Sequence, residues 1–99
     1  MKTLELTKTE LLPDIDVLED DLSGFHLIVW NDEVNTFDWV IDTLIKVCHH
    51  THEQAEQCTM LIHYKGKCSV KTGDYDELKI MCDGITDRGI GATVEELVS

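Results

Sequence analysis

The sequence predicts a single small α+β domain in which helices pack on one face of a three-stranded antiparallel sheet. Its 99 residues can bury one core but not two. Three segments have the composition or alternation of strands, and three others repeat apolar residues at the spacing of an amphipathic helix. Their order along the chain is strand, helix, helix, strand, helix, strand, which favours a short sheet covered by helices.

The first strand and the first helix are joined by a short polar segment. Residues 25–30 form a nearly continuous apolar run with β-branched and aromatic members, which predicts a strand buried on both faces. Asn35 or Thr36 can cap the helix that follows, because apolar residues recur at three- and four-residue spacing from Phe37 to Cys48.

The middle of the chain contains a second helix and a second strand. Thr51 and Gln54 have the spacing of a capping box, in which each side chain accepts a hydrogen bond from the other residue's backbone N–H. Gly66 stands where a C-terminal glycine ends such a helix. Residues 67–71 alternate polar and apolar side chains, which predicts a half-buried strand, and the chain turns at residues 72–73.

The last helix and the last strand complete the domain, which is expected over residues 23–99. Asp74 and Glu77 repeat the capping spacing, and Arg88 with Gly89 ends the helix that they begin. Residues 92–95 then form the third strand.

Residues 1–22 differ in composition from the rest of the chain. Seven acidic residues are interleaved with isolated leucines, and Pro13 interrupts any helix, so a mobile acidic extension is expected. No stretch has the features of a signal peptide or the ~20 apolar residues of a membrane span, so we expect a cytoplasmic protein without a membrane partner. Four cysteines are therefore interpreted as small buried apolar residues rather than disulfides: Cys48, Cys58, Cys68 and Cys82.

The charge of the chain restricts its partners. It has 20 acidic and 8 basic side chains, for a formal net charge of −12. A nucleic-acid partner is excluded on this ground, because binding a phosphate backbone requires cations on the protein. A cationic ligand or partner fits better, although solubility is the simpler explanation of the charge taken alone.

Two chemical interpretations rest on the cysteines and histidines. One is a metal site, because cysteine and histidine side chains, which are soft and borderline metal ligands, are frequent in the chain. Against it, the paired spacing that is typical of zinc ligands is absent. We expect the histidines between the first two helices to be exposed instead: His49, His50 and His52. The other is a cysteine hydrolase, but no local nucleophile signature accompanies the Cys and His residues, so an enzyme is not expected.

A third interpretation is a site for an amine. An ammonium group offers three hydrogen-bond donors and one positive charge, so it requires several acceptors, at least one of them anionic. Asn31, Asp32, Glu33 and a neutral His63 supply such acceptors if the second helix packs antiparallel to the first. The pattern alone also fits a turn with a helix cap and a structural histidine. Apolar residues stand beside these positions and can line a hollow: Phe37, Val40 and Ile62.

Residues 26–67 resemble the ClpS family, the bacterial adaptors of the Clp protease, without a gap. The resemblance rests on residues 27–33 (LIVWNDE), 38–42 (DWVID) and 55–67 (AEQCTMLIHYKGK), and it continues more loosely through 76–79 and 93–95. It implies a ClpS-like fold and a non-enzymatic adaptor without cofactor or metal. The family binds N-degron proteins that begin with leucine, phenylalanine, tyrosine or tryptophan and delivers them to an AAA+ unfoldase.

The resemblance also implies roles for individual residues. Asn31, Glu33 and His63 fall where the family contacts the α-amino group, with Asp32 in the same acidic corner. Glu33 stands where aspartate is usual, and Phe37 where methionine is common. The positions that line the family's hydrophobic pocket are Asn35, Phe37, Val40, Thr59, Ile62 and either Ile90 or Gly91.

The remaining surface follows the same resemblance. Glu77 and Lys79 are expected to contact the N-terminal domain of a ClpA- or ClpC-type unfoldase, and the 1–22 extension resembles the family's mobile segment. We expect a monomer. Two alternatives stay open: a small Cys/His metal-binding protein, and a docking module that shares only the fold.

Overall fold

The computed structural model describes residues 24–97, which form three strands and three helices in the predicted order. The predicted 1–22 extension lies outside these described residues. None of the helices in the described part is both long and apolar enough to cross a membrane. The elements are β2 (Phe25–Trp30), α2 (Phe37–Cys48), α3 (His52–Lys65), β3 (Lys67–Gly73), α4 (Tyr75–Asp87) and β4 (Ala92–Glu96).

The strands form one antiparallel sheet with β2 in the centre, between β3 and β4. Leu27 of β2 pairs with Lys71, whereas the next residue, Ile28, pairs with Ser69. Val70 is therefore an extra residue in β3 and forms a β-bulge. Because β2 is paired along both sides, its C-terminal end has a fixed position from which the following loop starts.

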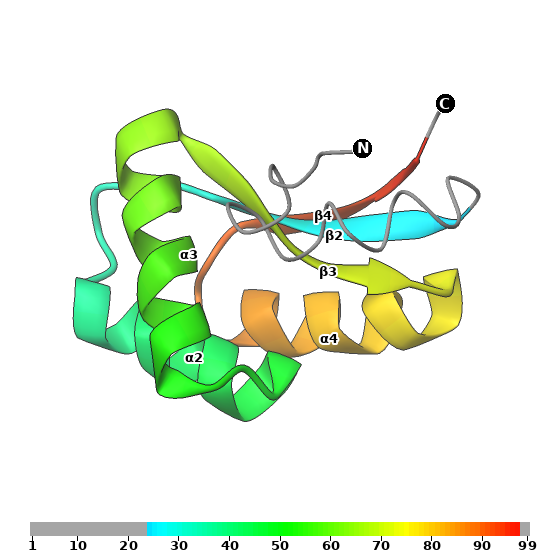
Figure 1. The fold of residues 1–99 in the computed structure, drawn as a ribbon, viewed down its shortest axis with the longest axis horizontal. Coiled ribbons are helices and arrows are strands. Elements are labelled where there is room, and N and C mark those ends of the chain that lie inside the picture. Colours follow the sequence, from blue (N-terminus) through cyan, green and yellow to red (C-terminus); the bar gives the residue numbers. More distant parts are fainter. Residues whose placement is uncertain (1–23, 98–99) are drawn as a thin grey trace, which may run out of the picture.

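The core lies between the sheet and the helices. Figure 1 shows α2 and α4 on the same side of the sheet, with α3 rising along one end of it. Leu27 and Val29 of β2 pack in one cluster with Leu44 of α2 and Ile85 of α4, and each is at most 1% exposed. Ile28 is buried as well, as expected for a central strand. The predicted α+β architecture is thus confirmed.

The helices begin at the predicted capping residues. Thr36 caps α2 through its side-chain oxygen, and Thr51 forms the expected capping box with Gln54, with bonds of 3.1 and 2.9 Å. Gly66 ends α3 with a φ of 93°, a conformation that glycine adopts without strain. Asp74 occupies the N-cap position of α4, but its side chain makes no capping hydrogen bond.

The prediction of an exposed histidine run is wrong for one of its members. His49 and His52 are exposed, whereas His50 is only 8% exposed. The reason is a long-range hydrogen bond of 2.9 Å between His50 Nε2 and the backbone carbonyl of Val70, at the β-bulge. Such a bond cannot be inferred from the local sequence pattern.

The cysteines divide into two pairs by exposure. Cys48 and Cys82 are buried in the apolar core, as predicted. Cys58 and Cys68 are half-buried and pack against that core from α3 and β3.

Candidate functional site

The loop between β2 and α2 is shaped by the carboxylate of Asp32. Its Oδ1 accepts the backbone N–H groups of Val34 and Asn35, each at 2.8 Å, and its Oδ2 accepts Asn35 Nδ2 at 2.7 Å. The backbone hydrogen bond from Asn35 is the largest cause that lowers the pKa of Asp32, and it outweighs the opposing effect of burial. Asp32 is therefore ionised at neutral pH and holds the loop in a compact turn.

Three further hydrogen bonds fasten this loop to the rest of the domain. Asn35 Nδ2 also donates to the carbonyl of Gly89, at 2.9 Å, in the turn after α4. The backbone N–H of Trp30 donates to the Gly91 carbonyl at 3.0 Å, and that of Asn31 donates to the Gly66 carbonyl at 2.9 Å. The loop is thus tied on one side to the start of β4 and on the other to the C-terminal end of α3.

Arg88 fixes the turn after α4 against α2. Its Nη2 forms an ion pair of 2.5 Å with Asp42, and its Nε donates to Thr43 Oγ1 at 2.8 Å. Its guanidinium lies 4.1 Å from the ring centroid of Trp39, whose Nε1 donates to the Arg88 carbonyl at 2.9 Å. Because Gly89 follows directly, this network also positions the carbonyl to which Asn35 donates.

His63 lies in the last turn of α3 and faces the beginning of α2. Its ring packs edge-to-face against Phe37, with centroids 5.1 Å apart, and against Tyr64, at 5.0 Å. The prediction that α3 returns His63 to the polar loop is therefore confirmed. Phe37 and Tyr64 remain 41% and 73% exposed, so the aromatic group lies at the surface.

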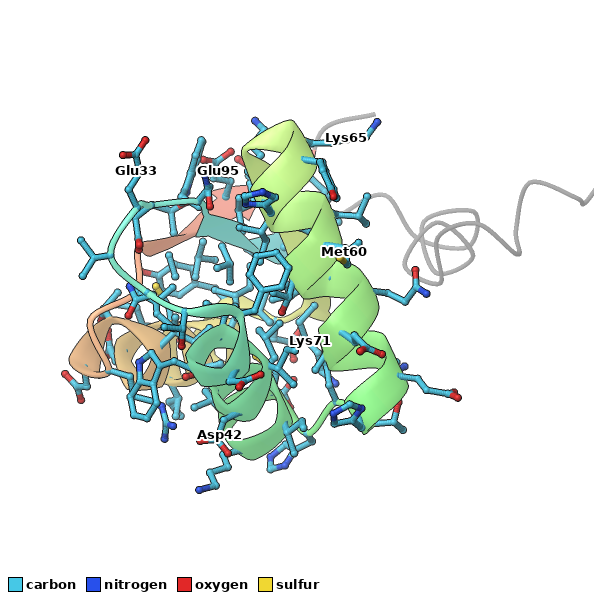
Figure 2. The ribbon with its side chains drawn as sticks, turned by 90° about the vertical axis from the view of Figure 1, so that its left-hand side faces the viewer. Glu33, Asp42, Met60, Lys65, Lys71 and Glu95 are labelled. Atoms are coloured by element: carbon cyan, nitrogen blue, oxygen red, sulfur yellow. The ribbon has the colours of Figure 1, made fainter. Side chains whose placement is uncertain are left out.

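A cavity of about 360 Å³ opens between the loop, α2 and α3. Its apolar part includes Val40 and Ile62, which are buried, and Thr59, whose hydroxyl donates to the Ala55 carbonyl at 2.7 Å and so needs no other partner. Figure 2 shows the Glu33 side chain extending outward from the loop, with its carboxylate exposed. The lining residues are Asn31, Asp32, Glu33, Asn35, Thr36, Phe37, Val40, Thr59, Ile62 and His63.

The structure brings together nine of the residues singled out from the sequence. All four polar residues proposed for the amine and five of the apolar-pocket residues line this one cavity. Ile90 and Gly91 are not among its lining residues: Ile90 is buried in the core, and Gly91 lies beside Trp30. Thr36 lines the cavity although the sequence indicated only a capping role for it.

The arrangement suits a ligand with one cationic and one apolar part. Two of the ten lining residues are acidic and none is lysine or arginine, so a positive charge is favoured at the mouth. The volume of the cavity is near the lower end of the range of small-molecule sites, which is roughly 300–1,000 Å³. Within residues 24–97, no group of three or more His, Cys, Asp or Glu residues is placed to hold a metal ion.

Comparisons with known proteins agree with this description. The family model "ATP-dependent Clp protease adaptor protein ClpS" matches residues 21–93. The Clp protease adapter ClpS of Salmonella arizonae is 36% identical over 83 residues, which cover 74% of this chain and 78% of that protein. The ClpS of Nitratidesulfovibrio vulgaris is 32% identical over 74 residues, covering 73% of this chain and 72% of that protein.

A solved structure has the same fold. It is Agrobacterium tumefaciens ClpS2 bound to L-phenylalaninamide, which matches with a TM-score of 0.64 at 15% identity. The match covers 76% of this chain and 98% of that chain.

Replacing Asp32 by asparagine tests whether its charge stabilises the loop. The pKa of Asp32 is lowered on folding, so its charge stabilises the folded state above the ordinary value of 3.8, and this contribution is lost as the pH falls through the lower folded value. We expect Asp32→Asn to lower the free energy of unfolding by about 0.5–1 kcal/mol at pH 7, as for other capping carboxylates. Urea unfolding of the wild type and the variant, at pH 7 and below pH 3, measures the difference in the free energy of unfolding at each pH.

Asp74→Asn is the matched control, because Asp74 makes no capping hydrogen bond through its side chain. It should change the free energy of unfolding little at either pH. If Asp32→Asn lowers the free energy of unfolding as much below pH 3 as at pH 7, the charge of Asp32 does not stabilise the loop.

Proposed function

The chain belongs to the ClpS family of Clp protease adaptors, and from this premise we propose that it recognises N-degrons. It binds substrate proteins by a free α-amino group and a bulky hydrophobic N-terminal residue, which is leucine, phenylalanine, tyrosine or tryptophan. It then delivers them, as a monomer, to the AAA+ unfoldase of the protease. As a member of a non-catalytic adaptor family, it is not an enzyme. The observation that carries the proposal is one cavity in which polar acceptors adjoin an apolar hollow.

The α-amino group is assigned to the polar part of the cavity. A chain terminus has a pKa near ~8, so it is mostly protonated at neutral pH and presents three donors. Asn31 and His63 line the cavity and each side chain has an atom that can accept a hydrogen bond, and Glu33 adds a carboxylate. Asp32 has both oxygens engaged within the loop, so it contributes its charge and holds the loop in place.

The N-terminal side chain is assigned to the apolar part of the same cavity. Val40 and Ile62 are buried, and the Thr59 hydroxyl is satisfied within α3, so this part offers little to a polar side chain. Burying one large apolar side chain is worth roughly 1.5–3 kcal/mol. L-phenylalaninamide, which is bound by A. tumefaciens ClpS2, combines a free amine with such a side chain and supports the assignment.

This division of roles gives strong selectivity for chain termini. An internal peptide bond has no ammonium group, so it would leave the acceptors of Asn31, Glu33 and His63 without donors once the bound chain covers them. Sites built to hydrogen-bond a donor reject analogues that lack it by large factors, of the order of 10⁴. An apolar pocket alone would discriminate far less between a chain terminus and an internal segment with the same side chain.

Blocking the amino group of a peptide tests the proposal directly. We expect a labelled peptide that begins with phenylalanine to bind, and its N-acetylated form to bind at least about 100-fold more weakly, because charge and donors are both lost. Asn31→Ala should weaken binding of the unblocked peptide at least about tenfold, the loss of one hydrogen bond to a charged group. Fluorescence anisotropy gives the dissociation constants, and circular dichroism checks the fold.

Gln57→Ala is the matched control, since it removes an exposed amide on α3 outside the cavity lining. It should leave the affinity unchanged. Equal binding of the unblocked and acetylated peptides would exclude N-terminal recognition and leave a docking module that shares only the fold.

The unfoldase is assigned to α4, which does not line the cavity. Glu77 and Lys79 are exposed in its first half, and Ile80 beside them is an apolar residue that is 73% exposed. Lys79 Nζ donates to Asp83 Oδ1 at 2.7 Å, and this hydrogen bond is the main cause that raises the pKa of Lys79. The charged and apolar groups of this helix are thus available while a substrate occupies the cavity.

Charge reversal on α4 tests this assignment. Glu77→Lys together with Lys79→Glu should weaken binding to the N-terminal domain of the unfoldase at least about tenfold, because like charges would oppose the partner's complementary groups. Isothermal titration calorimetry measures that affinity, and the affinity for the phenylalanine peptide should not change. Glu53→Lys, in the exposed first turn of α3, is the control. An unaltered unfoldase affinity in the double variant would place the docking surface elsewhere.

A further inference from the structure

The side chain of Arg88 is held on three sides although it lies outside the cavity. The C-terminal end of α4, where Arg88 stands, lies beside α2 (Figure 1). The guanidinium pairs with Asp42, donates to the Thr43 hydroxyl, which is fully buried, and stacks on the Trp39 ring. A planar guanidinium with two hydrogen-bond partners and an indole against its face has little freedom to move. None of these four residues lines the cavity.

The backbone of the turn after α4 is fixed as well. The N–H of Arg88 donates to the Ile85 carbonyl at 3.0 Å, and that of Gly89 donates to the Thr86 carbonyl at 2.9 Å. Gly89 has a φ of 87°, which other residues rarely adopt, and Ile90 after it is only 2% exposed in the core. The carbonyl of Gly89 therefore lies between a residue bound to α2 and a residue packed in the core, so its direction is defined.

This carbonyl accepts the Asn35 amide of the cavity loop. Asn35 Nδ2 donates to the Gly89 carbonyl at 2.9 Å and to Asp32 Oδ2 at 2.7 Å. Both partners can only accept, so they use the two hydrogens of the amide and fix its orientation. The bond to Gly89 is exposed, and a bond there between two mobile groups contributes little, because water competes and ordering both groups costs entropy. It can hold the loop because the carbonyl is already fixed.

We propose that Arg88 is a positioning residue for the N-terminal residue of the substrate, acting through the Gly89 carbonyl and Asn35; this inference rests on the proposed function. Asn35 and Asp32 both line the cavity, and the turn that they form carries Glu33 at its mouth. With Arg88 in place, the loop is ordered before the ligand arrives, and less entropy is lost on binding. Without it, the turn after α4 is free to move relative to α2, and the ligand must order the loop itself.

The affinity of the full-length protein for a labelled peptide that begins with phenylalanine, measured by fluorescence anisotropy, tests the proposal. We expect Arg88→Ala to weaken binding at least about fivefold, the effect of one hydrogen bond, although Arg88 does not touch the cavity. Asn35→Ala should weaken binding at least as much. Because both changes break the same connection, adding Arg88→Ala to Asn35→Ala should weaken binding by less than a further factor of about two. A general effect of Arg88 on the fold would instead lower the affinity equally in both backgrounds.

Lys46→Ala is the matched control. Lys46 Nζ lies 3.5 Å from the same Asp42 carboxylate that Arg88 binds, but its side chain is 65% exposed and it does not contact the turn after α4. Removing this cation should leave the affinity for the peptide unchanged.

The outcomes separate this inference from the proposed function. Wild-type affinity in Arg88→Ala, or losses in Arg88→Ala and Asn35→Ala that multiply in the double variant, overturns the role of Arg88 and leaves N-terminal recognition intact. If Arg88→Ala fails to fold, Arg88→Lys decides, since it keeps a cation for Asp42 but loses the planar stack on Trp39. It should weaken binding about two- to threefold, and wild-type affinity in it overturns the proposal. If the wild-type protein does not bind the peptide, the proposed function fails and the inference with it.

Discussion

The Asp32 carboxylate accepts hydrogen bonds from two backbone N–H groups and one side-chain amide of the same loop, and the site depends on this turn. Without it, residues 31–36 would be a polar connection between a strand and a helix. With it, the Asn35 amide is oriented to reach the Gly89 carbonyl, and Asn31 stays at the end of α3. The acceptors at the mouth of the cavity are therefore held in place before a ligand arrives, which reduces the entropy lost on binding.

The fold supplies the other side of the site. The central strand β2 delivers the loop to the N-terminal end of α2, and the antiparallel return of α3 places His63 against Phe37. Arg88 joins α2 to the turn after α4. This turn carries the Gly89 carbonyl to which Asn35 of the loop donates, so Arg88 also supports the loop.

Local patterns in the sequence were sufficient for the elements, whereas the grouping of the site residues was expected mainly from the resemblance to the ClpS family. The Thr36, Thr51 and Gly66 caps and the helical spacing of apolar residues depend only on near neighbours, so they could be read directly. The burial of His50 could not be inferred in this way, because it depends on a hydrogen bond to a β-bulge twenty residues later in the chain. The turn at Asp32 is local and agrees with the turn that the sequence pattern also allowed, but the pattern did not show that both carboxylate oxygens are used within the loop.

We propose that this cavity holds the first residue of a substrate chain. The most direct measurement is a crystal structure of the protein with a short peptide that begins with phenylalanine. We expect the ammonium nitrogen to lie within hydrogen-bond distance, about 2.7–3.2 Å, of Asn31 and His63 side-chain atoms. The phenyl ring should contact Val40, Thr59 and Ile62. A peptide bound elsewhere, or bound in the cavity with its amino terminus in solvent, would contradict it.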